Sequence, residues 1–163
     1  GVTALISDSG VARYRVDAEG WMMYDRKKPS YWAFEKGVYM EQFDSIFNVE
    51  ASIKADTAYY YDKERLWKLI GNVDIQNRKG ERFNTELLYW NEATQKVYSD
   101  KFIRIQQPDR IITGHGFDSN QQMTIYTIRN IEGIFYVDEE ASSGPPQPET
   151  KALPDSVNKD TAK

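Results

Sequence analysis

The stretch Leu66–Ile75, with the sequence LWKLIGNVDI, carries the pattern that decides the fold. From residue 67 its odd positions hold Trp, Leu, Gly, Val and Ile, whereas its even positions hold Lys, Asn and Asp, with Ile70 as the exception. Because successive side chains of a β-strand point to opposite faces, this alternation predicts a strand with one apolar face.

The same alternation recurs along the chain. It runs through residues 12–18 (ARYRVDA), 49–55 (VEASIKA), 103–105 (IRI) and 125–128 (IYTI). Turn-forming residues are predicted at 8–10, 62–64, 78–80, 91–93, 108–109 and 118–120. Such short spacing favours hairpins, because parallel connections need about a dozen residues or more. The sequence therefore predicts an all-β, antiparallel fold.

An imperfect internal repeat supports this interpretation. Residues 55–62 (ADTAYYYD) are echoed by 85–91 (TELLYWN) and more weakly by 114–120 (GHGFDSN). Strands are expected to follow at 66–75, 96–105 and 123–131, so the spacing is about 27 to 31 residues, in the range of stacked repeat units. Since one such unit cannot bury its apolar face alone, we expect repeated hairpins to form a twisted, open sandwich with an apolar interior.

Composition excludes several functions. The chain has 163 residues, a net charge of −4, no Cys and a single His, and its pI is near 5.1. A general nucleic-acid binder needs a basic face, so we expect no nucleic-acid partner. Disulfides, thiolate metal sites and a Cys nucleophile are impossible. We predict no metal and no cofactor.

Few residues suggest catalysis. His115 lies between two glycines with no second His nearby in the sequence, so a surface or turn role is favoured over that of a general base. The carboxylates of Asp56 with Glu86, or Asp62 with Glu64, resemble glycosidase pairs only in residue type, because acidic side chains occur on the solvent face of any soluble β protein. We therefore predict that the protein is not an enzyme.

Two regions differ in composition. Residues 1–136 are rich in aromatic and β-branched residues, whereas residues 137–163 contain no aromatic residue and four of the six prolines. The first region is predicted to be the β domain and the second a flexible, acidic, Pro-rich tail. No apolar run reaches the roughly 20 residues that span a bilayer. Because a strand follows Gly1 almost at once, we expect an anchoring segment upstream of it.

Several motifs, taken in order, resemble those of the LptC family, the periplasmic component of lipopolysaccharide export. The resemblance covers roughly residues 2–136 and rests on residues 10–18 (GVARYRVDA), 52–58 (SIKADTA), 69–75 (LIGNVDI), 83–90 (FNTELLYW) and 114–117 (GHGF). The chain departs from the family pattern in its greater number of Tyr and Trp residues and its longer Pro-rich tail.

The resemblance implies a β-jellyroll-like sandwich that holds lipid, anchored to the inner membrane of a Gram-negative bacterium and exposed to the periplasm. Such a protein would bind lipopolysaccharide in an apolar groove. It would receive the lipid from the LptB–LptF–LptG transporter, which is driven by ATP, and pass it to an LptA-like bridge protein. Burial of the acyl chains would supply the binding free energy, because each buried methylene contributes about 0.8 kcal/mol. No catalytic residue is needed in the groove.

Alternation and the resemblance together predict the residues involved. The groove is expected to be lined by Tyr14, Val16, Phe34, Val38, Met40, Ala51, Ile53, Leu69, Val73, Ile75, Ile103 and Ile105. The last strand, predicted from Thr124 to Tyr136, is the expected edge for the bridge protein, through Thr124, Tyr126, Ile128 and Ile131.

Two alternatives remain open at this stage. One is a soluble LptA-like bridge protein, which would differ from LptC in having a cleaved signal peptide. The other is a carbohydrate-binding or adhesive β-sandwich, which would present Trp32 or Trp90 as an exposed stacking platform.

Overall fold

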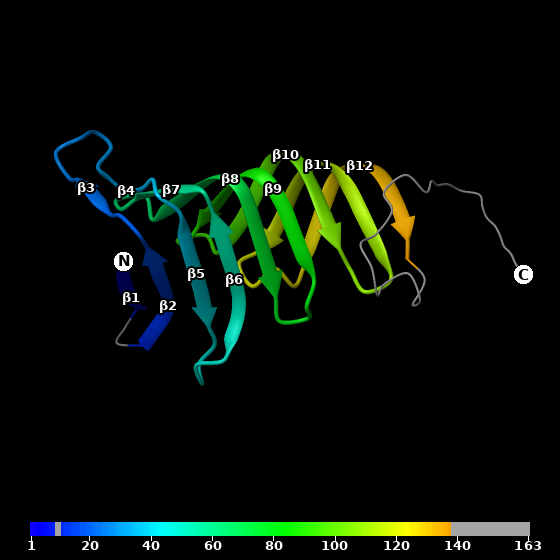
Figure 1. The fold of residues 1–163 in the computed structure, drawn as a ribbon, viewed down its shortest axis with the longest axis horizontal. Helices are drawn as coiled ribbons and strands as arrows, with labels where there is room; N and C mark the ends of the chain where they lie inside the picture. The colour runs from blue at the N-terminus through cyan, green and yellow to red at the C-terminus, as the bar shows by residue number, and fades with distance from the viewer. Residues whose placement is uncertain (9–10, 138–163) are drawn as a thin grey trace, which may run out of the picture.

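The computed structural model describes residues 1–8 and 11–137, which form one open antiparallel sheet of twelve strands (Figure 1). The strands are β1 (Val2–Asp8), β2 (Val11–Ala18), β3 (Met22–Tyr24), β4 (Tyr31–Phe34), β5 (Val38–Phe43), β6 (Val49–Ala55), β7 (Thr57–Tyr61), β8 (Leu66–Asn77), β9 (Arg82–Asn91), β10 (Lys96–Gln106), β11 (Arg110–Asn120) and β12 (Tyr126–Tyr136). The predicted all-β, antiparallel, open fold is confirmed. The predicted tail lies outside the described residues, except for Val137.

The sheet divides at β8, the longest strand. The C-terminal half of β8 pairs with β6, which places Ile53 opposite Ile75, and the path continues through β5 and β2 to β1. The N-terminal half pairs with β7, which places Ala58 opposite Leu69, and this branch continues through β4 to β3. On the other side β9, β10, β11 and β12 follow in order.

The sheet bends along a line that crosses the middle of the long strands. The register of β8 with β9 shifts between Ile70 and Val73, and comparable shifts interrupt the β9–β10, β10–β11 and β11–β12 pairs. In β8 the bend is made by Gly71 and Asn72, whose φ angles are +85° and +47°. Only residues that tolerate the left-handed region fit there at low cost.

The bend folds the sheet into two layers. The first layer contains β1, β2, β5, β6 and the C-terminal half of β8, and the second contains β3, β4, β7 and the N-terminal half of β8. The strands β9 to β12 cross the bend, so each contributes one half to either layer; the C-terminal half of β9 pairs with the N-terminal half of β8 and belongs to the second layer. The layers face each other, because the Tyr14 ring of β2 lies edge-on to the rings of Trp67 and Trp90, at 6.3 and 5.0 Å between centroids. The predicted sandwich is therefore a single folded sheet.

The core lies between the layers and is formed by the alternating apolar positions. Its largest fully buried side chains are Trp67, Phe34, Phe83, Phe117, Met40, Leu69, Ile75, Leu88, Ile103, Ile105, Met123 and Val73. Aromatic contacts continue along the interior, from Phe34 against Trp67 at 5.5 Å to Phe83 against Phe117 at 5.7 Å. The high aromatic content of the sequence thus builds the core.

The predicted turns at 62–64, 78–80 and 91–93 are present, and 108–109 forms a bend. The turn predicted at Asp118–Asn120 is wrong, because β11 continues to Asn120 and the turn follows at residues 121–125. The polar side chains have other partners: Asp118 binds Arg129, and Asn120 Oδ1 accepts hydrogen bonds from the backbone N–H groups of Thr124 and Ile125. The turn predicted at 8–10 includes residues 9–10, outside the described residues.

Candidate functional site: an apolar interior with a polar mouth

All twelve residues predicted to line the groove face the interior. None is more than 8% exposed, and all except Ala51 belong to one continuous hydrophobic cluster. The bend preserves which face of each strand points inward, so the alternating positions stay buried on both sides of it. Leu69, Val73, Ile75, Ile103 and Ile105 have no exposed surface. Any guest molecule can therefore reach these positions only when the two layers separate.

Opposite the bend, the hairpin turns of the two layers face each other, and we call this side of the sandwich the mouth. Its N-terminal part holds a cavity of about 620 Å³. The first layer contributes Arg13, Gln42 and Glu50 to its walls, and the second layer contributes Arg65 and Gln95. The mouth is therefore polar, although the interior directly behind it is apolar.

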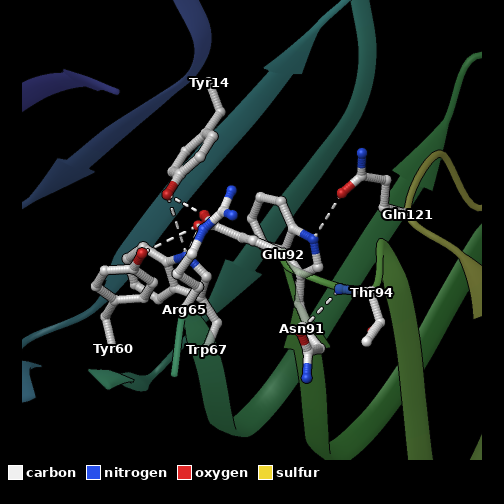
Figure 2. Close-up of polar contacts among 9 residues, drawn as sticks. Tyr14, Tyr60, Arg65, Trp67, Asn91, Glu92, Thr94 and Gln121 are labelled. Carbon is white, nitrogen blue, oxygen red and sulfur yellow. Dashed lines mark hydrogen bonds and ion pairs between the residues drawn. The ribbon is translucent and has the colours of Figure 1, made fainter. Parts of the chain in front are cut away.

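Glu92, at the turn between β9 and β10, lies at the base of the mouth (Figure 2). Its carboxylate accepts hydrogen bonds from the phenol of Tyr60 at 3.0 Å, the indole Nε1 of Trp67 at 3.1 Å, and the phenol of Tyr14. The Arg65 guanidinium lies 3.8 Å away. The Glu92 side chain is only 9% exposed, so these partners compensate for the loss of water around its charge.

Burial and the Glu92 carboxylate also act on the two phenols. The pKa of Tyr14 is raised far above its ordinary value, first because burial disfavours the phenolate and second because Glu92 repels it. The pKa of Tyr60 is raised for the same two reasons in the same order. Both phenols therefore stay protonated at physiological pH and act as hydrogen-bond donors.

Further along the mouth the layers are joined directly. Asn77, at the end of β8, donates from Nδ2 to the carbonyl oxygen of Met123 at 2.8 Å, and so links the first layer to the β11–β12 turn. Gln107 Nε2 donates to the phenol of Tyr126 at 2.6 Å. With the bond between Tyr14 and Glu92, these contacts hold the mouth at three points along its length.

The predicted partner edge lies on the terminal strand β12, which pairs only with β11 in the described part of the sheet. Tyr126, Ile128 and Ile131 belong to this strand, and Ile131 is 57% exposed. Thr124 does not: β12 begins at Tyr126, and Thr124 lies in the preceding turn, where its Oγ accepts a hydrogen bond from Asn120 Nδ2. The predicted start of this strand was therefore two residues too early.

Two of the carboxylates considered for catalysis, Asp56 and Glu86, support the bend instead. Asn72 donates from Nδ2 to Asp56 at 2.9 Å and from its backbone N–H to Glu86 at 3.3 Å, so both carboxylates flank the turn of β8. His115 is exposed and its Nδ1 contacts Glu132 on the neighbouring strand. In residues 1–8 and 11–137 no group of His, Asp and Glu could hold a metal ion.

Sequence reasoning missed the polar mouth. Glu92 was interpreted only as part of a turn, and its partners Tyr14 and Trp67 lie in distant strands. The only local signal was that the predicted turn at 91–93, which contains Glu92, follows directly after Tyr89 and Trp90. The exposed stacking platform expected for a carbohydrate-binding sandwich is absent at Trp90, which is only 3% exposed and donates its indole N–H to Gln121 at 3.1 Å.

An open β-sandwich with an apolar interior, a polar mouth and a free terminal strand is the architecture of a binding or transport component. Residues 4–136 match the family model described as "Lipopolysaccharide-assembly, LptC-related". The chain therefore belongs to the LptC-related family, whose members are periplasmic, non-enzymatic components of lipopolysaccharide transport. No curated protein sequence matches the chain. None of the described residues lies in a helix long and apolar enough to cross a membrane.

Proposed function

We propose that this protein binds lipopolysaccharide with its acyl chains between the two layers and relays it from the LptB–LptF–LptG transporter to an LptA-like bridge protein. The observation that carries the proposal is the continuous apolar cluster that connects all but one of the predicted groove residues from β2 to β10. Together with the family match, this cluster supports a continuous apolar path along the molecule.

The interior must open for this function. Its side chains are closely packed, so acyl chains would replace contacts between the layers with contacts to lipid. The exchange costs little free energy, because each acyl methylene that moves from water into the interior contributes about 0.8 kcal/mol of favourable transfer free energy. Hydrogen bonds at the mouth are the main interactions to be released, and each contributes on the order of 1 kcal/mol. Opening is therefore within reach of lipid binding alone.

The terminal strand β12 is the proposed contact for the bridge protein. Its outer edge has no partner strand among the described residues, and strand addition would satisfy its backbone groups. Upstream of Gly1 we propose a segment that anchors the protein to the inner membrane.

Photo-crosslinking tests the lipid path. A benzophenone amino acid at Phe34 replaces one aromatic side chain with another at a position that is buried in the interior. We expect it to capture lipopolysaccharide in cells, as should similar probes at Leu69 and Ile103. A probe at Lys68, beside Leu69 on the opposite face of β8, is the control and should capture none. If no interior probe captures lipid in folded protein, the proposal fails.

A second pair of probes tests the edge. A probe at Ile131 on β12 should crosslink to the bridge protein, whereas one at Leu5 on β1, which is 63% exposed at the opposite end of the sheet, should not. Capture of the bridge protein at Leu5 alone would reverse the proposed direction of the relay.

A further inference from the structure

The segment of residues 22–31, which joins β3 to β4 and which we call the basic hairpin, has a charge opposite to that of the whole chain. It carries Arg26, Lys27 and Lys28, the only three consecutive cationic residues in the sequence, although the chain has a net charge of −4. All three are exposed, and none forms an ion pair with a residue that the structure describes. Asp25 is the one acidic residue of the segment, so its turn presents an excess of positive charge to solvent.

Exposed apolar side chains lie directly beside this charge. Met22 and Met23 of β3 are each 57% exposed. As neighbours in one strand they point to opposite faces, and both stay exposed because β3 pairs only with β4. Edge strands of soluble proteins commonly carry charged side chains that keep other molecules away. Two methionines at such an edge instead indicate a surface that contacts an apolar phase.

The basic hairpin is held in a fixed shape. The rings of Tyr24 and Tyr31, which are opposite each other in the β3–β4 pair, stack at 4.9 Å between centroids. Ser30 is buried, and its Oγ donates to the carboxylate of Asp62 in the β7–β8 turn at 2.6 Å. The cations and methionines are therefore presented on an ordered scaffold, so binding would order few additional residues.

The basic hairpin also lies at one extremity of the molecule. Figure 1 shows it projecting beyond β1 at the end of the long axis where the N-terminus lies. A surface that approaches this end meets the turn of the hairpin first. The β5–β6 turn provides a contrast, because Ile46 and Phe47 are 73% and 61% exposed but residues 44–48 contain no cation.

We propose that the basic hairpin binds the surface of a bilayer that contains anionic phospholipids. Arg26, Lys27 and Lys28 lie among the anionic head groups, and the two methionines enter the boundary between head groups and acyl chains. Charge attraction and buried apolar area together are what hold peripheral segments on anionic membranes. An apolar pocket on a partner protein would accommodate the methionines but would leave the unpaired cations beside them without a role.

This contact is separate from the acyl-chain path. No residue of the basic hairpin belongs to the apolar cluster formed by the described residues. Binding of the hairpin to a bilayer holds the N-terminal end of the sandwich at the membrane surface and leaves the interior unchanged. Membrane binding and lipid capture at Phe34 can therefore fail independently of each other.

Vesicle sedimentation with the whole chain tests the charge. The protein should bind vesicles of phosphatidylglycerol and phosphatidylcholine in equal parts, should not bind phosphatidylcholine alone, and should be released by added salt. Replacing the three cations with Arg26→Gln, Lys27→Gln and Lys28→Gln should lower the partition coefficient roughly hundredfold, because each cation near an anionic surface contributes about fivefold.

The matched control makes the same change in net charge at three exposed lysines elsewhere in the sheet. These substitutions are Lys79→Gln, Lys96→Gln and Lys101→Gln. The control should bind the mixed vesicles almost as the parent does. Equal loss of binding in both triple variants would show a non-specific charge effect and overturn the proposal, as would a folded parent that does not bind the mixed vesicles.

A polarity-sensitive fluorophore tests insertion. Because the chain has no cysteine, Met23→Cys provides a single labelling site. A label there should shift its emission to shorter wavelength on the mixed vesicles, whereas the same label at Phe47→Cys should not. A shift at Phe47 with none at Met23 would overturn the proposal. Lipid capture by the probe at Phe34 should persist in the folded hairpin variant, so failure of the membrane contact is distinguishable from failure of the proposed function.

Discussion

The phenol of Tyr14 on β2 donates a hydrogen bond to the carboxylate of Glu92, 78 residues further along the chain, and this bond joins the two layers at the mouth. The same carboxylate binds Tyr60 and Trp67, both from its own layer. Glu92 therefore links Tyr14 of the first layer to Tyr60 and Trp67 of the second layer. We therefore expect both the stability of the sandwich and the opening of its mouth to depend on Glu92.

Replacing Glu92 tests this dependence. Glu92→Ala leaves the buried indole N–H of Trp67 without its carboxylate, so we expect a loss of about 2 kcal/mol in the free energy of unfolding, measured by urea titration. Glu64→Ala, at an exposed position in the β7–β8 turn, should change stability by less than about 0.5 kcal/mol. Equal effects of the two variants would contradict the role assigned to Glu92.

Alkaline pH should weaken the same junction. The folded-state pKa values of Tyr14 and Tyr60 are raised, so above the ordinary tyrosine pKa of about 10 the folded protein keeps protons that the unfolded chain releases. The stabilisation is thus complete below about pH 10 and declines above it. Urea midpoints measured across this range should fall with pH, and less steeply in Tyr60→Phe. Identical slopes in the parent and the variant would refute this explanation.

Asn77→Ala should loosen the other part of the mouth. Asn77 Nδ2 donates to Met123 O and Glu81 Oε1, and its Oδ1 accepts from the backbone N–H groups of Lys79 and Glu81. We expect a loss of about 2 kcal/mol in stability and faster lipid capture by the probe at Phe34. Asn84→Ala, at a position outside the core, is the control. Slower capture in a folded Asn77→Ala protein would show that this contact does not restrain opening.

Gly114→Ala should displace the edge strand. A Cβ at this position would lie 2.4 Å from the carbonyl oxygen of Asn130 on β12, and backbone cannot give way as a flexible side chain can. We expect destabilisation of about 2 kcal/mol and faster hydrogen exchange of β12 amides. Gly20→Ala, whose nearest neighbour is the Lys36 side chain at 3.5 Å, should have little effect. Unchanged β12 exchange in Gly114→Ala would contradict the close packing of β11 and β12.

The resemblance at the level of motifs was confirmed by the family match over residues 4–136. It could be found from sequence because the motifs consist of neighbouring residues whose order is preserved. The turn predicted at Asp118–Asn120 failed for the opposite reason. Asp, Ser and Asn favour turns by binding their own backbone, but here Asp118 is occupied by Arg129, a partner from the next strand. A polar residue whose side chain bonds to a residue on another strand cannot be distinguished from a turn residue by local composition.

The sequence by itself determined which side chains face inward. Alternation depends only on the geometry of one strand, so it indicates the inward-facing side of β8 without any knowledge of neighbouring strands, and Leu69, Val73 and Ile75 on that side are fully buried. The left-handed Gly71 and Asn72 then preserve this assignment across the bend. Only the tertiary structure decided that the sheet folds on itself and brings Tyr14, Trp67 and Glu92 together at a polar mouth. Such contacts join residues of opposite layers, and the alternation of apolar and polar residues within one strand carries no information about them.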